Sequence, residues 1–289
     1  MNETKLKKIV TRLLVFFIGI PLVLLLVHFS HFNFILLHIT ILVLSIIATN
    51  ELHKIFQTKY PLQSKTLLII LNALFPITSF SINFTYLKTD CIPLLLVFSV
   101  FIILIYEIFY QKYENEQLFE NSCSRIAYST FIVFYIGFLS SYITKICYTP
   151  YPKEYLYIFL GMVFACDSLA WFFGMLFGKN NRGFILASPN KSITGFLGGI
   201  FGSILVAFLG KYLFPQAFNS SALKIFIFGI ILSCASIIGD LAESVLKRSS
   251  NTKDSGQVIP GRGGILDSID SILITAPFYY YLIQLFFGA

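Results

Sequence analysis

The sequence has little charge for its length. Of its 289 residues, 12% are charged, whereas 56% are hydrophobic and 17% are aromatic. An ordinary soluble domain carries about 25% charged residues, so this chain has roughly half the charge that usually covers a soluble globule. A disordered chain is poor in aromatic and β-branched residues, and this chain is rich in both. The composition therefore argues against a soluble enzyme, excludes a disordered protein and indicates a protein that lies in a lipid bilayer.

The sequence also lacks the spacings of common metal, nucleotide and transporter motifs. Its five cysteines are dispersed and form no CxxC pair, which argues against a disulfide framework and against a structural zinc site. It contains neither a Walker A segment nor a GxGxxG segment. No internal repeat is visible, so the inverted-repeat pattern of many transporters is missing. The four histidines, His28, His31, His38 and His53, have no carboxylate at a spacing suited to a metal or catalytic pair.

Nine long apolar runs are present. A helix needs about 20 mostly apolar residues to cross the hydrocarbon core of a bilayer. Backbone groups in hydrocarbon must be paired within the segment, so runs of this length are helices rather than barrel strands. We predict an all-α polytopic integral membrane protein with about nine transmembrane helices. The predicted spans are residues 13–29, 34–49, 66–87, 92–109, 127–143, 155–177, 196–214, 222–239 and 269–287.

Basic residues are distributed unevenly between the connections. Lys and Arg are enriched in cytoplasmic loops of membrane proteins. With the N-terminus in the cytoplasm, 16 of the 21 Lys and Arg residues fall in cytoplasmic segments and 5 on the other face. The net charge of +7 is therefore interpreted as a sign of topology, and no nucleic-acid partner is predicted. This topology places the two most polar connections, residues 178–195 and 240–268, on the same cytoplasmic face.

Polar residues divide the chain into two parts. Residues 1–150 carry almost no polar residue within their spans except Ser, Thr and Asn, and we interpret them as a scaffold of transmembrane helices. Residues 151–289 carry ionisable groups inside or at the ends of spans, where such groups are costly and mark functional sites. Asp167, near the middle of the sixth span, is either functional or a structural carboxylate paired with a neighbouring Lys or Ser. Gly174 and Gly178 have the GxxxG spacing that lets helices approach closely.

The connection after the sixth span predicts an anion-binding turn. It contains Ser188, Lys191 and Ser192. Small polar residues here suit a turn that leads into a helix N-terminus, where unpaired N–H groups and Lys191 would hold an anion such as phosphate. The alternative is a basic loop that only fixes the topology.

The densest polar stretch follows the eighth span. On a helix that continues this span, carboxylates and cations lie together on one face, because their spacing follows the helical repeat. These residues are Asp240, Glu243, Ser244, Lys247 and Arg248. A basic–acidic pair, a glycine-rich segment and a second pair of carboxylates follow: Lys253, Asp254, Gly261, Arg262, Gly263, Gly264, Asp267 and Asp270.

Such a stretch is suited to metal-assisted transfer of a phosphoryl or nucleotidyl group. Carboxylate oxygens hold Mg²⁺ on a polyphosphate, cations neutralise the charge of the leaving pyrophosphate, and glycine lets backbone N–H groups reach phosphate oxygens. A solvated charged loop is the alternative, but it would not explain carboxylates at the ends of membrane helices.

The same residues resemble the signature of the phosphatidate cytidylyltransferase family, also called CDP-diacylglycerol synthases, which are integral membrane enzymes. The residues that carry the resemblance are Ser244-x-x-Lys247-Arg248-x4-Lys253-Asp254, then Pro260-Gly261-x-Gly263-Gly264 and Asp267-x-x-Asp270. The resemblance extends upstream to Asp167 and covers roughly residue 155 to the C-terminus. It departs from the family pattern at two positions, since Arg262 stands where the family usually has His, and Ser268 where it usually has Arg.

The resemblance implies transfer of CMP from CTP to phosphatidic acid, which gives CDP-diacylglycerol and pyrophosphate for phospholipid biosynthesis. It implies that Mg²⁺ is required, with a second, monovalent cation such as K⁺ beside it. Asp240 and Asp267 would hold Mg²⁺ with support from Asp270, and Lys191 and Ser192 would meet the lipid phosphate or the nucleotide. The CTP phosphates would be bound by Lys247, Arg248 and Lys253, with Asp254 a further ligand or a residue that orients Lys253. The other predicted substrate contacts are Ser188, Ser244, Gly261, Arg262, Gly263, Gly264 and Asp167.

The departure at Arg262 has a mechanistic consequence. Arginine stays protonated at any working pH, so a mechanism with an obligatory histidine base at that position is not available. The lipid phosphate, which is already anionic at neutral pH, would then attack without help from a base.

Two other functions stay open at the level of sequence. A CTP-dependent lipid kinase, such as a polyprenol or phytol kinase, shares some of the motif features, and a transporter would use Asp167 as an ion or proton site. We expect the protein to lie in a bacterial plasma membrane with its site facing the cytoplasm, because the N-terminus is not of the transit type. The GxxxG spacing is compatible with a homodimer.

Overall fold

A computed structural model describes residues 18–29, 31–84, 90–109, 119–259 and 263–289, and most of these residues are helical. Isolated β-bridges join Arg182 to Ser192 and Ile259 to Gly263 within loops. A short helix, Ile18–His28, precedes the labelled elements. These elements are α2 (His31–Phe56), α3 (Lys65–Phe84), α4 (Ile92–Phe109), α5 (Ser122–Ile132), the π-helix η1 (Val133–Phe138), α6 (Leu139–Ile146), α7 (Pro152–Phe177), α8 (Ile193–Leu213), α9 (Ala222–Ser249) and α10 (Leu266–Phe287).

The helices confirm the predicted all-α polytopic membrane architecture. Eight helices in the described part of the chain are long and apolar enough to cross a bilayer, with α5, η1 and α6 forming one continuous span from Ser122 to Ile146. The first predicted span, residues 13–29, is represented by Ile18–His28, and its residues 13–17 lie outside the described residues. The eighth predicted span continues as a helix to Ser249, as the spacing of its charged residues predicts.

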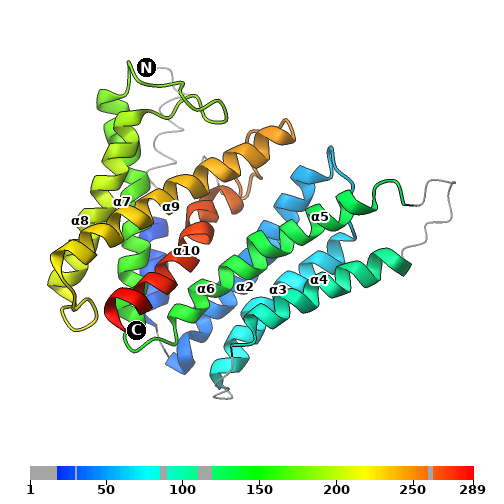
Figure 1. Cartoon of the computed structure of the whole chain (residues 1–289), viewed down its shortest axis with the longest axis horizontal. Coiled ribbons are helices and arrows are strands. Elements are labelled where there is room, and N and C mark those ends of the chain that lie inside the picture. Colours follow the sequence, from blue (N-terminus) through cyan, green and yellow to red (C-terminus); the bar gives the residue numbers. More distant parts are fainter. Residues whose placement is uncertain (1–17, 30, 85–89, 110–118, 260–262) are drawn as a thin grey trace.

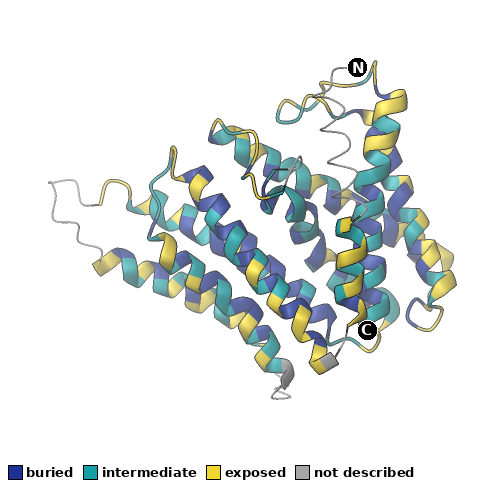
Figure 2. Cartoon of the chain, turned by 180° about the vertical axis from the view of Figure 1, so that it is seen from behind, coloured by how far each residue is buried: buried dark blue, intermediate teal, exposed yellow. Residues whose placement is uncertain are grey.

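The last helix, α10, joins two groups of helices (Figure 1). On one side it packs against α9 and α7, and on the other against α6 and α2. Its Leu266 and Leu273 belong to the apolar cluster built with α2 and α3, whereas its Ala276, Tyr279 and Ile283 belong to the cluster built with α7 and α9. Figure 2 shows the buried residues along the facing sides of the helices. Because α10 belongs to both clusters, it connects the two groups of helices.

Helices α7 and α8 pack closely through glycines. A Cβ atom at Gly198 would lie 2.7 Å from Phe173 Cβ and 2.8 Å from the Leu169 carbonyl oxygen, so only hydrogen fits there. The GxxxG pair of α7 takes part in the same packing, since Gly174 and Gly178 face Ser192 at the beginning of α8. This spacing therefore serves contact within the chain, as small residues do between membrane helices.

We predict that Gly198→Ala destabilises the protein, because the added methyl group forces α7 and α8 apart. Overpacking of this kind costs about 1–3 kcal/mol. The measurement is the midpoint of thermal unfolding in detergent. Gly19→Ala is the matched control, since Gly19 also lies in a helix but a Cβ there would meet nothing within 4 Å. Equal unfolding midpoints for the two variants would contradict this interpretation.

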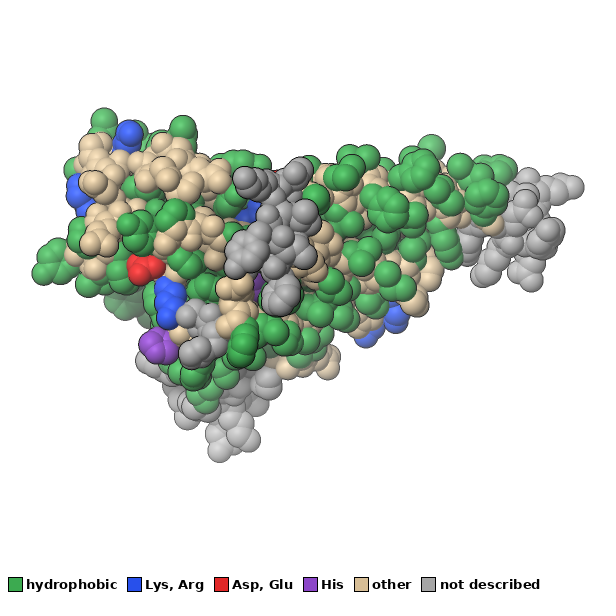
Figure 3. All heavy atoms as spheres, turned by 90° about the horizontal axis from the view of Figure 1, so that it is seen from below, with side chains coloured by type: hydrophobic (Ala, Val, Ile, Leu, Met, Phe, Trp, Pro, Cys, Tyr) green, Lys and Arg blue, Asp and Glu red, His purple; other side chains and the backbone are tan. Residues whose placement is uncertain are grey.

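The polar connections gather at one end of the bundle. Lys59 Nζ donates to the Ser249 carbonyl oxygen at 2.8 Å, and Arg248 Nε donates to the Ala187 carbonyl oxygen at 3.4 Å. These contacts bring residues 178–195 and 240–268 to the same end, as the count of basic residues predicts. At the other end, Lys145 Nζ pairs with Asp90 Oδ2 at 2.5 Å. Figure 3, a view from below, is dominated by hydrophobic side chains with few charged ones where side chains are described.

Candidate active site

The candidate site is built around the turn between α9 and α10. After α9 ends at Ser249, Asn251 adopts a left-handed conformation with a φ of 55°, and Gly263 has a φ of 121°. A Cβ atom at Gly263 would collide with the carboxylate of Asp267. The glycine there thus permits both the turn and the close approach of the backbone to the first acidic residue of α10.

The two oxygens of Asp267 have different environments. Oδ2 accepts hydrogen bonds from three donors, which are Ser255 N at 2.9 Å, Ser255 Oγ at 2.9 Å and Gly264 N at 2.7 Å. Oδ1 lies 2.5 Å from Lys247 Nζ. The turn therefore fixes Oδ2 and leaves Oδ1 facing the ammonium group of Lys247.

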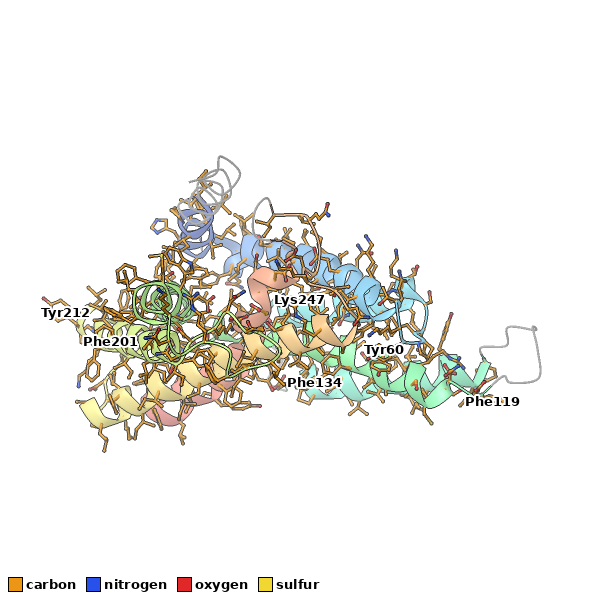
Figure 4. All side chains as sticks on the ribbon, turned by 90° about the horizontal axis from the view of Figure 1, so that it is seen from above. Tyr60, Phe119, Phe134, Phe201, Tyr212 and Lys247 are labelled. Carbon is orange, nitrogen blue, oxygen red and sulfur yellow. The ribbon has the colours of Figure 1, made fainter. Side chains whose placement is uncertain are left out.

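Lys247 connects two carboxylates from different helices. Besides Asp267, its ammonium pairs with Glu243, one turn earlier on α9. The Glu243 side chain is 1% exposed and the Lys247 side chain 13%, so this is a buried ion pair. Figure 4 labels Lys247 where α9 meets the beginning of α10. Because the interior screens charge poorly, the ammonium acts strongly on any anion that approaches it.

Lys191 reaches the site from the loop before α8. Ser192 is the N-cap of α8, and its Oγ accepts a hydrogen bond from Gly195 N at 3.1 Å. Lys191 N donates to the Ser188 carbonyl oxygen at 3.1 Å, which closes the preceding turn. The structure confirms the predicted turn that leads into a helix N-terminus. This turn places the Lys191 ammonium in an ion pair with Asp240 of α9.

A second group of carboxylates lies beside these ion pairs. Asp270, on the turn of α10 after Asp267, is buried, and its Oδ1 accepts a hydrogen bond from Ser271 N at 2.6 Å. Asp240 of α9 and Asp167 of α7 both lie close enough to act on Asp270 electrostatically. The structure thus brings acidic residues of three helices together at the polar end of the bundle.

Other predicted site residues lie around this centre. Arg248 is exposed and donates to the Ala187 and Thr252 carbonyl oxygens, each at 3.4 Å. Lys253 and Asp254 are exposed on the loop, and Ser244 is half-buried on α9. In this structure the amides of Gly263 and Gly264 are used within the turn, by the Ile259 carbonyl oxygen and by Asp267. Gly261 and Arg262 lie outside the described residues.

Two residues of the first 150 also reach this region, and sequence reasoning missed both. The carboxylate of Glu51, on α2, accepts hydrogen bonds from Ile265 N at 3.0 Å and Leu266 N at 2.8 Å. The hydroxyl of Tyr135, in the π-helix, is buried and has no hydrogen-bond partner among the residues that the structure describes, and Asp270 and other site carboxylates act on it electrostatically. A lone acidic residue directly after an apolar run was the available signal for Glu51. No comparable signal marked Tyr135.

The donor set suits a hard cation such as Mg²⁺, which takes oxygen ligands. Asp240, Glu243, Asp267 and Asp270 bring four carboxylates. Within the described ranges Lys191 pairs with Asp240, and Lys247 with both Glu243 and Asp267, whereas Asp270 has no ion pair. The two predicted metal ligands, Asp240 and Asp267, each pair with a different lysine. Among the described residues, no three His, Cys, Asp or Glu side chains are arranged as a complete metal site. Their chemistry fits a divalent cation, whose entry would compete with the lysines.

Comparison with known proteins shows the family of this chain. A model described as the cytidylyltransferase family matches residues 10–286, which is nearly the whole chain. The chain belongs to the cytidylyltransferase family. This confirms the family to which the signature residues point.

Several curated proteins similar to this chain are named phosphatidate cytidylyltransferase. The protein of Haemophilus influenzae is 36% identical over 159 residues, which are 54% of this chain and 54% of that protein. The protein of Synechocystis is 41% identical over 125 residues, 43% of this chain and 41% of that protein. The protein of Bacillus subtilis is 34% identical over 162 residues, 56% of this chain and 59% of that protein. The chain spans about half the length of the curated relatives it matches.

Proposed function

We propose that this protein transfers CMP from CTP to phosphatidic acid, producing CDP-diacylglycerol and pyrophosphate. The family and the relatives named phosphatidate cytidylyltransferase support this proposal. The observation that carries it is the gathering of acidic residues of α7, α9 and α10 with two lysines at the polar end of an otherwise apolar bundle. At such a place a water-soluble nucleotide and a lipid phosphate can meet.

In the proposed reaction, a phosphate oxygen of the lipid forms a bond to the α-phosphorus of CTP. The bond between that phosphorus and the oxygen bridging to the β-phosphate breaks, and pyrophosphate leaves with the electron pair. The attacking phosphate is already anionic, so the step needs no histidine base, in agreement with Arg262 in the glycine-rich segment. Mg²⁺, when bound, neutralises charge on the polyphosphate.

The lysines have a defined role in this proposal. Lys247 and Lys191 are paired with carboxylates in the structure. Phosphate groups and a divalent cation together would replace these pairings, because the cation takes the carboxylates and the phosphates take the ammonium groups. Lys247, with Arg248 and Lys253, would then bind the CTP phosphates, and Lys191 with Ser192 would meet the lipid phosphate or the nucleotide.

The proposed metal ligands are Asp240 and Asp267, with Asp270 in support. Oδ1 of Asp267 is the oxygen that would serve, since Oδ2 already accepts three hydrogen bonds. The excess of carboxylates over lysines also supports a second, monovalent cation such as K⁺. Asp254 would be a further ligand or would orient Lys253.

The proposed setting is a bacterial inner membrane with the site facing the cytoplasm. The long apolar helices and the bacterial relatives support an integral membrane protein. The basic residues at the polar end support its cytoplasmic orientation. A homodimer would need a surface other than the helix face that carries Gly174 and Gly178, because the beginning of α8 packs against that face.

Labelled CTP tests the proposed reaction directly. We expect label from the α-phosphate of CTP to enter the lipid when the purified protein is incubated with phosphatidate and Mg²⁺ in micelles, together with release of pyrophosphate. Label from the γ-phosphate should stay out of the lipid. Transfer of the γ-label into a lipid would identify a CTP-dependent lipid kinase instead. Absence of any lipid product over a full Mg²⁺ titration would refute the proposal, and substrate accumulation in vesicles would then favour a transporter.

A further inference from the structure

Glu51 occupies the beginning of α10, although it belongs to α2. Its side chain is buried, with 4% of the residue exposed. Oε1 accepts a hydrogen bond from Ile265 N at 3.0 Å, and Oε2 accepts one from Leu266 N at 2.8 Å. The first N–H groups of a helix have no partner within the helix, and a negative charge is favourable beside them. Glu51 therefore caps α10 from a helix more than 200 residues away in the sequence.

The surroundings of Glu51 leave space for its carboxylate. A Cβ atom at Gly256 would lie 2.5 Å from Glu51 Oε1, and one at Gly264 would lie 2.5 Å from Oε2. In the part of the chain that the structure describes, no lysine or arginine pairs with Glu51. Backbone amides thus balance this buried carboxylate, so its stabilising effect on the beginning of α10 depends on the geometry of the turn.

A single hydroxyl group connects Glu51 with the candidate metal ligand. Ser255 Oγ lies 3.2 Å from Glu51 Oε2 and 2.9 Å from Asp267 Oδ2, and it has one proton to donate. Gly264 N, next to the amides that Glu51 holds, also donates to Asp267 Oδ2. The orientation of Asp267 therefore depends on the same turn that Glu51 fastens to α2.

We propose that Glu51 is a positioning residue for nucleotidyl transfer: through the first amides of α10 and Ser255, it holds Asp267 with Oδ1 directed at the cation and substrate phosphates. This inference rests on the proposed function. It also assigns the helices before residue 150 a part in the reaction, because α2 fixes the turn that carries the metal ligand.

The test is Glu51→Gln. Glutamine has nearly the same size, but it turns one of the two acceptor oxygens into an NH₂ group that faces a backbone or hydroxyl donor. Two measurements are made on the purified full-length protein in detergent. The first is hydrogen–deuterium exchange over residues 263–268 without metal, and the second is CDP-diacylglycerol formation as a function of Mg²⁺, CTP and phosphatidate.

Glu107→Gln is the matched control. Glu107 is also a buried helical glutamate, with 5% exposed, but it pairs with Arg125 and accepts a hydrogen bond from Gln63. Both variants lose one buried negative charge, so both are expected to unfold at lower temperature. Only Glu51→Gln should change the hydrogen exchange of the turn and the dependence of the rate on Mg²⁺.

For Glu51→Gln we expect faster exchange over residues 263–268, a kcat lower by about 10- to 100-fold, and half-saturation at about tenfold more Mg²⁺, with little change in KM for CTP. Glu51→Asp, which keeps both oxygens, should recover part of the kcat. Glu107→Gln should leave the exchange and the Mg²⁺ dependence unchanged.

Two results would overturn the inference. One is unchanged exchange over residues 263–268 in Glu51→Gln, and the other is a Mg²⁺ dependence that shifts equally in the Glu107 control. If the unaltered protein forms no CDP-diacylglycerol, the proposed function fails by itself. The exchange measurement then decides alone whether Glu51 fastens the turn that orients Asp267.

Discussion

Asp267→Asn is expected to lower the rate of CDP-diacylglycerol formation by about 1,000-fold while the protein still inserts and folds. The turn would hold the amide oxygen in the place of Oδ2, where Ser255 and Gly264 donate hydrogen bonds. The amide NH₂ group would then stand at the position of Oδ1, beside Lys247. An NH₂ group cannot ligate a cation, so the variant loses the oxygen that faces Lys247 and that would hold the cation in the proposed reaction.

Asp90→Asn is the matched control for this substitution. Asp90 also pairs with a lysine at 2.5 Å, but it lies at the opposite end of the bundle, beside Lys145. Initial rates with saturating CTP and Mg²⁺, divided by the amount of folded protein from size-exclusion chromatography, compare the two variants. If Asp267→Asn keeps more than about a tenth of the rate, Asp267 is not a metal ligand in this reaction.

Lys247→Met is expected to harm both stability and turnover. Removing the ammonium leaves Glu243, with a side chain only 1% exposed, without its buried cation. Loss of one partner of a buried ion pair costs about 3–5 kcal/mol of folding free energy. Loss of a cation from the proposed polyphosphate site should lower turnover by about 100-fold or more.

A double variant separates the two effects of Lys247→Met. Glu243→Gln/Lys247→Met removes the buried Glu243 charge and leaves Asp267 as the carboxylate without the Lys247 ammonium, so part of the stability should return, whereas turnover should stay low. Thermal unfolding measures the first effect, and kcat/KM for CTP measures the second. Recovery of turnover together with stability would mean that Lys247 supports the fold and does not act on the nucleotide.

The polarity pattern of the sequence was enough to predict most of the fold. Apolar runs predicted the membrane helices, because hydrocarbon demands helices of a minimum length. Charge spacing predicted that α9 continues to Ser249, since residues on one helical face repeat every three or four positions. The signature residues also pointed to the family that nearly the whole chain matches. These features depend on residues that are near one another in the sequence, so they can be predicted without knowing how the helices pack.

The internal arrangement of the site could not be predicted in the same way. The GxxxG spacing of α7 was compatible with contact between two chains, and only the packing of α8 shows that it is used within one. The pairing of Lys191 with Asp240 likewise joins segments 49 residues apart. The periodicity of a sequence shows which face of a helix is polar or apolar, but it does not show which helix packs against that face.

By itself, the sequence determined that this is a polytopic helical membrane protein with a charged end, and it marked the residues of the cytidylyltransferase signature. The tertiary structure alone decided that Glu51 of α2 caps α10 and that Oδ1 of Asp267, rather than Oδ2, is directed toward the lysine. The physical reason is distance along the chain. The contacts of Glu51 join residues 214 and 215 positions apart, and such contacts follow from how whole helices fill space together.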